Sequence, residues 1–150
     1  MQDDKQIARR KRWMSLLAKA PATALAQLWS ELGEDPAHTM LRAPEVGGVM
    51  VRGRAGAVGG PFNLGEMTVT RASLRLTDGT VGHAYVQGRD REKARIAALV
   101  DALMQTGQAD IIETRILTPL EAQLETARAT RAAKAAATKV DFFTMVRGED

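Results

Sequence analysis

The stretch from Pro61 to Leu99, PFNLGEMTVTRASLRLTDGTVGHAYVQGRDREKARIAAL, carries the pattern that decides the fold. Polar and apolar residues alternate through two runs that are rich in β-branched residues, and Asp78-Gly79 lies between the runs. Asp-Gly in this position predicts a tight two-residue hairpin, in which both central residues need a positive φ. After Gly88 the apolar residues adopt helical spacing. The stretch therefore predicts an antiparallel hairpin that runs directly into a helix.

Working outward toward the N-terminus, the sequence predicts two further strands and a helical hairpin. The segments TMLRAP and GGVMVRGRA are also rich in β-branched residues, so residues 39–88 are expected to form an antiparallel meander of about four strands. Before them, residues 1–36 contain two apolar stripes at helical spacing, with Pro21 suited to a first helical turn and Gly33 to a left-handed helix end. The stripes are Trp13, Leu16, Leu17, Ala20 and Leu25, Leu28, Trp29, Leu32.

Toward the C-terminus the pattern predicts two helices and a tail. Residues 90–106 form a helix that Asp90 can cap and Gly107 can end. The segment ADIIETRIL, residues 109–117, is then expected as an edge strand. A capping box of Thr118 and Glu121, with proline at the first helical position, predicts a helix over 118–138. The whole chain is predicted to be a single α+β domain.

The tail, residues 139–150, holds two of the three phenylalanines of the chain. The helix before it offers little except alanine and charge beyond Leu124, so it has little to bury. Two interpretations stay open: the tail folds back on its own core, or it docks on another subunit through Phe142, Phe143 and Met145.

Composition excludes several classes of protein. There is no cysteine among the 150 residues, so disulfides and thiolate catalysis are excluded. No run of about 18 apolar residues and no signal-peptide pattern is found, so a cytoplasmic protein is expected. The net charge is +3, and the basic run ARRKRW is typical of a solvated helix face, or else of a contact to nucleic acid or an acidic partner.

Catalytic and metal-binding motifs are weak. His38 and His83 are the only histidines and have no ligand spacing around them, so no metal site is expected. No Gly-x-Ser-x-Gly motif occurs, which gives a hydrolase little support. The glycines of RGRAGAVGGPFNLG lead into a strand rather than a helix, so they indicate a hairpin loop more than an anion-binding loop.

Strand alternation nevertheless groups cationic side chains. If the strands pair in sequence order, side chains around the hairpin could converge on one sheet face with Arg52 and Arg54, where arginine forks suit phosphate oxygens. A solvated face is the alternative. His83 could transfer protons, although a lone strand histidine is more often structural. The candidates for substrate or partner binding are Arg71, Arg75, His83, Tyr85 and Arg89, and none of them is assigned as catalytic.

The segments PFNLGEMTVTRASLRL and GTVGHAYVQGRDREKARIAALVDALMQ closely resemble the PhnG family, the G subunit of the carbon-phosphorus lyase core complex. The resemblance covers roughly residues 10–120 and is most specific from Pro61 to Gln105. It implies a role in phosphonate catabolism, in which the complex replaces the adenine of ATP by methylphosphonate.

The resemblance also implies partners and a division of labour. The expected partners are the H, I and J subunits, with the I subunit in the most direct contact. The L subunit is expected as a partner in function. Nucleosidase-like chemistry is implied for the I subunit, so this chain would be non-catalytic or co-catalytic. It would bind no cofactor itself, and ATP and methylphosphonate would be substrates of the complex. Two other functions stay open: a stand-alone enzyme or binding protein for phosphorylated ligands, and a nucleic-acid-binding module.

Overall fold

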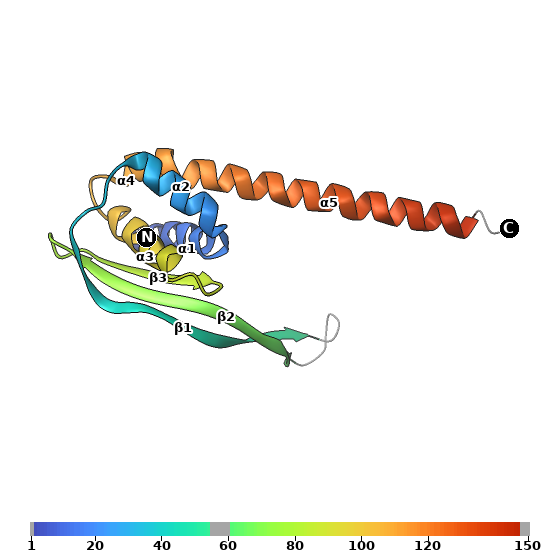
Figure 1. The fold of residues 1–150 in the computed structure, drawn as a ribbon, viewed down its shortest axis with the longest axis horizontal. Helices are drawn as coiled ribbons and strands as arrows, with labels where there is room; N and C mark the ends of the chain where they lie inside the picture. The colour runs from blue at the N-terminus through green and yellow to red at the C-terminus, as the bar shows by residue number, and fades with distance from the viewer. Residues whose placement is uncertain (1, 55–60, 148–150) are drawn as a thin grey trace.

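The chain is α+β, with helices at both ends of an antiparallel sheet (Figure 1). The computed structural model describes the backbone of residues 2–54 and 61–147, and the side chains of residues 2–52 and 65–139 within them. The described elements are α1 (Gln2–Lys19), α2 (Ala22–Leu32), β1 (His38–Arg54), β2 (Pro61–Leu76), β3 (Val81–Gln87), α3 (Arg91–Leu103), α4 (Ala109–Ile112), the π-helical turn η1 (Glu113–Leu117) and α5 (Thr118–Arg147).

Helices α1 and α2 form the N-terminal helical hairpin that the two apolar stripes predict. One tryptophan from each helix, Trp13 and Trp29, is buried in the core. Pro21 is extended and directly precedes the first residue of α2, one position earlier than expected. Gly33 ends α2 with a φ of 73°, in the left-handed region that glycine adopts readily.

The sheet has three strands in the order β1-β2-β3, paired antiparallel, rather than the four expected. The two strands predicted between residues 39 and 55 are one strand, because β1 continues through Pro44. Its pairing with β2 shifts register between Arg42 and Glu45. A proline in an edge strand can leave the sheet ladder intact, since its missing N–H can face away from the neighbouring strand.

The hairpin between β2 and β3 differs from the predicted two-residue turn. Gly79 N–H donates to the carbonyl of Leu76 at 3.0 Å, and Leu76 N–H donates to the carbonyl of Thr80 at 2.8 Å. Gly79 has a φ of 93°, whereas no non-glycine residue in the described part of the chain has a positive φ. This is a three-residue loop whose last residue is left-handed, so the expectation of a positive φ at Asp78 was wrong.

Helix α3 covers the inner face of the sheet and supplies much of the core. Ala94, Leu99 and Val100 have no exposed surface. A Cβ added to Gly82 of β3 would overlap the backbone carbonyl oxygen of Ala98, so the close approach of helix and strand depends on glycine at this position.

The predicted start of α3 is confirmed and its predicted end is wrong. Asp90 is extended and its carboxylate accepts a hydrogen bond from Lys93 N–H at 2.9 Å, which caps the helix. The helix ends at Leu103, four residues before Gly107. Thr106 Oγ1 donates to the carbonyl of Leu103 at 2.7 Å, so a polar side chain satisfies the helix end.

The segment after α3 is helical and contains no edge strand. Ile112, Ile116 and Leu120 are fully buried at spacings of four residues, which is a helical stripe. Thr118 has helical φ and ψ, so it lies inside the helical run and does not act as the predicted N-cap. Pro119 follows the π-helical turn η1. Because proline lacks an N–H and crowds the preceding turn, the wider π turn lets the helix continue past it.

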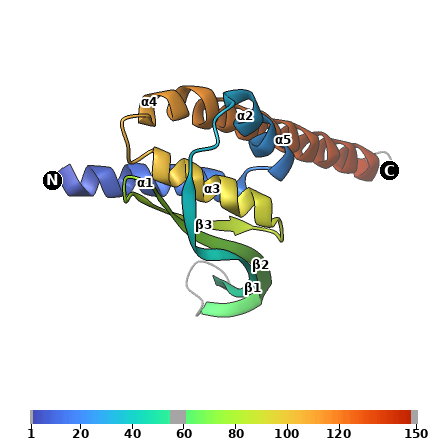
Figure 2. The same cartoon turned by 60° about the vertical axis from the view of Figure 1, so that its left-hand side comes forward.

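Two projections extend from the compact part of the molecule. Figures 1 and 2 show all the helices on one side of the sheet, the other sheet face open, and α5 running far beyond the remaining helices. Helix α5 continues to Arg147, so residues 139–147 are helical rather than an extended tail. The β1–β2 ribbon projects beyond β3, because β3 reaches only as far as Val69 along β2.

Candidate functional site

The most heavily bonded polar group in the described interior is a carboxylate that sequence analysis did not single out. Asp101 of α3 has no exposed surface. Its carboxylate accepts from Arg10 Nε at 3.1 Å and Nη2 at 2.7 Å, and from Trp13 Nε1 at 2.8 Å. It also accepts from the backbone N–H of His83 at 2.8 Å. One side chain therefore joins α1, α3 and β3, and the bond to Asp101 raises the pKa of Arg10.

The same side of α3, together with Gln105 just beyond its end, covers the free edge of β3. Gln105 Nε2 donates to the carbonyl of Val81 at 2.9 Å, and Lys93 Nζ donates to the carbonyl of Gln87 at 3.2 Å. Together with the bond from His83 to Asp101, these contacts occupy three backbone groups along the edge. Burial lowers the pKa of Lys93, whose ammonium also donates to the carbonyl of Ala18.

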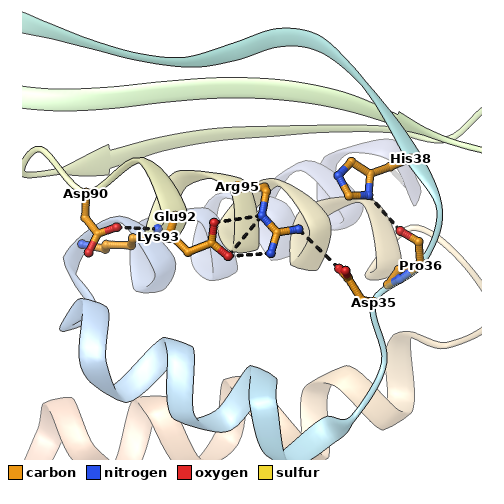
Figure 3. Close-up of polar contacts among 7 residues, drawn as sticks. All are labelled: Asp35, Pro36, His38, Asp90, Glu92, Lys93 and Arg95. Carbon is orange, nitrogen blue, oxygen red and sulfur yellow. Dashed lines mark hydrogen bonds and ion pairs between the residues drawn. The ribbon is translucent and has the colours of Figure 1, made fainter.

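A second ion-pair group ties α3 to the chain that follows α2. Figure 3 shows the Arg95 guanidinium between Glu92 on its own helix and Asp35, which lies between α2 and β1. The pKa of Glu92 is lowered by its hydrogen bonds to Arg95. His38 donates from Nδ1–H to the carbonyl oxygen of Pro36 at 2.8 Å, so this histidine is hydrogen-bonded within the loop. These contacts indicate a structural role for this group.

The open sheet face brings together four of the five candidate residues. Register places Arg71 opposite Tyr85, Ser73 opposite His83, and Arg75 opposite Val81. Directly paired residues share a sheet face, so Arg71, Arg75, His83 and Tyr85 lie on the face that no helix covers. All four are exposed. They form the outer-face cluster.

Partners on β1 complete the outer-face cluster and partly neutralise it. Glu45 lies opposite Arg71, and its carboxylate lies 3.4 Å from Arg71 Nε and 3.2 Å from Arg42 Nη1. All these groups are about half exposed, so the ion pairs are weak and can be displaced by another anion.

Two predicted candidates are not part of the outer-face cluster. Arg89 follows β3 and is not part of the paired strands. Arg52 pairs with Asn63, seven residues beyond Glu45 along β1, so at about 3.3 Å per residue it lies roughly 23 Å from the Arg71 row. The expected convergence of Arg52 with the outer-face cluster was therefore wrong. The side chain of Arg54 lies outside the described residues, as do residues 55–60 of the glycine-rich segment.

His83 lies on the open face with its side chain exposed. Its backbone, not its ring, makes the bond to Asp101. In the part of the chain that the structure describes, the imidazole has no hydrogen bond to a carboxylate that could orient it for proton transfer. The geometry therefore supports ligand or partner contact at His83 better than general acid or base chemistry.

The basic run of α1 is largely used within the chain. Arg10 binds Asp101, and Arg12 binds Glu113 and Glu121 at 2.6 and 2.9 Å. Arg9 lies over the ring of Trp13 at 5.9 Å. Arginines that are held in intrachain pairs are poorly placed to neutralise nucleic-acid phosphates. The side chains of Phe142, Phe143 and Met145 lie outside the described residues.

Comparison with known proteins places the chain in a family. The profile of the family described as "Phosphonate metabolism protein PhnG" matches residues 8–148. A protein of Rhizobium meliloti (strain 1021), named alpha-D-ribose 1-methylphosphonate 5-triphosphate synthase subunit PhnG, is 45% identical over 148 residues, which is 99% of this chain and 95% of that protein. The chain belongs to the PhnG family of phosphonate metabolism proteins, and the match includes the C-terminal helix.

Two further findings bear on the class of protein. Over the described ranges, no three residues among histidines, aspartates and glutamates are grouped so that they could hold a metal ion. Over the same ranges, no helix combines the length and the apolar composition needed to cross a membrane.

Proposed function

We propose that this chain is an assembly subunit of an alpha-D-ribose 1-methylphosphonate 5-triphosphate synthase. In this role it supports transfer of the ribose 5-triphosphate moiety of ATP to methylphosphonate, with release of adenine. The support for the synthase is the relative that carries this name, which matches nearly the whole chain. We propose the H, I and J subunits of the carbon-phosphorus lyase complex as its partners, with the I subunit in the most direct contact. The L subunit is proposed as a partner in function, and the complex is proposed to lie in the cytoplasm.

One structural observation carries the assembly role. Every residue from 125 to 138 of α5 is exposed, so this part of the helix adds nothing to the described hydrophobic core. Alanine gives such a helix propensity, but an exposed stalk of this length contributes little to the fold of its own domain. A stalk that ends in the apolar residues Phe142, Phe143 and Met145 is well suited to insertion into another subunit.

The outer-face cluster is the proposed second contact. Three arginines, Arg42, Arg71 and Arg75, share the open face with one carboxylate, Glu45. The excess of positive charge suits either an acidic partner surface or the triphosphate of the substrate at a shared interface. We propose that Arg71, Arg75, His83 and Tyr85 make this contact, with Arg89 at its margin, while the reacting groups come from the partner. The chain then needs no cofactor of its own.

The test is co-expression with the H, I and J subunits, purification through a tag on this chain, and native mass spectrometry of the product. A stable hetero-oligomer is expected. A chain that purifies alone in the presence of all three subunits contradicts the assembly role.

A pair of variants then separates assembly from substrate contact. His83→Ala is expected to reduce synthase activity much more than it reduces assembly, because its side chain is exposed on the open sheet face. Thr39→Ala, in the row of Arg75 but without charge, is the matched control and should leave both unchanged. Equal losses of activity and assembly in His83→Ala would assign the histidine to a structural role.

A further inference from the structure

The outer edge of β1 is unprotected over residues 46–51. In the described part of the chain, no helix, loop or side chain hydrogen-bonds to this edge. Every second residue of an edge strand directs its N–H and C=O away from the sheet, so these groups can pair with another strand.

The edge of β3 and the first part of the β1 edge are both protected against pairing with another strand, unlike residues 46–51. The edge of β3 is occupied by Lys93, Asp101 and Gln105. The first part of β1 contains Pro44, a charged pair of Arg42 and Glu45, and two register shifts. Proline, charge and irregularity are the usual means by which proteins prevent edge pairing.

The stretch from Val46 to Val51 has none of these protections. Its sequence is VGGVMV, without charge or proline, and it pairs with β2 in unbroken register. Met50 is 54% exposed although it is apolar. A regular, uncharged edge with an exposed apolar side chain favours addition of a strand.

We propose that residues 46–51 of β1 pair antiparallel with the same residues of a second copy of this chain, around a two-fold axis at Val49. The two sheets of three strands then form one continuous sheet. In such an isologous pairing the same patch is used on both copies.

The register follows from charge. Directly opposed residues share a face, so the two-fold axis can pass through either Gly48 or Val49 but not between them. The Glu66 carboxylate lies over Gly48, where a Cβ would overlap it. An axis at Gly48 would therefore bring the two Glu66 carboxylates side by side, and like charges directly opposed are destabilising.

An axis at Val49 instead brings opposite charges together. Met50 is paired with Glu66, so both lie on one face. Arg52 lies on that face too, because the extra residue at the next register shift belongs to β2 and β1 keeps alternating. Gly48 then lies opposite Met50 of the second copy, and Arg52 of that copy lies diagonally within reach of Glu66. Neither Arg52 nor Glu66 has an ion pair within the described residues, so Arg52 of each copy can pair with Glu66 of the other.

The absence of cysteine permits a direct test of this register in the full chain. Val49→Cys puts a single thiol on the axis, where opposed Cα atoms are about 4.5–5.5 Å apart and a disulfide can form. Val51→Cys is the matched control on the same face, and its two thiols would be separated by four residues along the strands, about 13 Å, which is too far to bridge. Mild oxidation should cross-link Val49→Cys and leave Val51→Cys monomeric on a denaturing gel.

Sedimentation of the unmodified chain and of charge variants completes the test. The full chain should be dimeric, Met50→Lys should be monomeric, and Arg52→Glu and Glu66→Arg should each weaken the dimer by about fivefold or more. The double variant should recover part of the loss. A monomer at all concentrations, or equal cross-linking at both cysteine positions, overturns the proposal. Because no other subunit is needed, failure of this test leaves the synthase role untouched.

Discussion

Replacement of Asp101 tests whether a single buried carboxylate holds α1, α3 and β3 together. In Asp101→Ala, the indole N–H of Trp13 and the backbone N–H of His83 lose their acceptor in the interior. Each unsatisfied buried donor costs about 1–3 kcal/mol, so about 4 kcal/mol of unfolding free energy should be lost. The Arg10 side chain is 35% exposed and can be rehydrated, so we assign it no further cost.

The assay is urea unfolding followed by circular dichroism, with linear extrapolation to water. For a slope of about 2 kcal/mol per molar urea, the midpoint should fall by about 2 M. Asp101→Asn keeps the shape but presents an NH₂ group to one of the donors, so it should also lose about 2 kcal/mol or more.

Arg12→Ala is the matched control on the same helix. Its guanidinium binds two carboxylates, but it is 40% exposed, so its loss should cost less than about 1 kcal/mol. If Asp101→Asn and Arg12→Ala shift the midpoint equally, the reasoning about burial is refuted.

Three other predictions concern the fold. Gly82→Ala should destabilise by about 1–3 kcal/mol in the same urea assay, because its Cβ would meet the carbonyl of Ala98, and a midpoint equal to wild type would contradict the close contact. Glu92 has a lowered pKa in the folded chain, so it contributes stability at neutral pH that is lost as pH falls through that pKa. In Glu92→Gln the free energy of unfolding should therefore fall less on acidification, by a difference of less than about 1 kcal/mol. An acid side of the stability–pH curve equal to wild type would count against the pair with Arg95. Removal of residues from Val140 onward should leave the free energy of unfolding within about 0.5 kcal/mol of wild type while weakening assembly. Loss of cooperative unfolding would show that this segment belongs to the domain core.

Local chemistry made several elements predictable. The cap at Asp90, the left-handed end at Gly33 and the apolar stripes of the N-terminal hairpin depend on residues within one or two turns, so the sequence contains their causes. The alternation in β2 and β3 likewise predicted which side chains share the open face.

The wrong predictions depended on neighbours distant in the sequence. The capping-box pattern at Thr118 is also compatible with a helix interior, and burial of Ile116 and Leu120 kept the helix running through it. The two strands predicted before residue 55 are one strand, because at the edge of the sheet Pro44 does not interrupt the hydrogen bonds between strands.

The sequence by itself determined the α+β class, the family, and the residue types on the open sheet face. Only the tertiary structure decided that Asp101 would be the buried acceptor for two other elements and that Arg52 would lie far from Arg71. Both outcomes depend on register and on helix packing, which place residues far apart in sequence side by side. Periodicity along one segment carries no information about such distances, so they become visible only when the chain is folded.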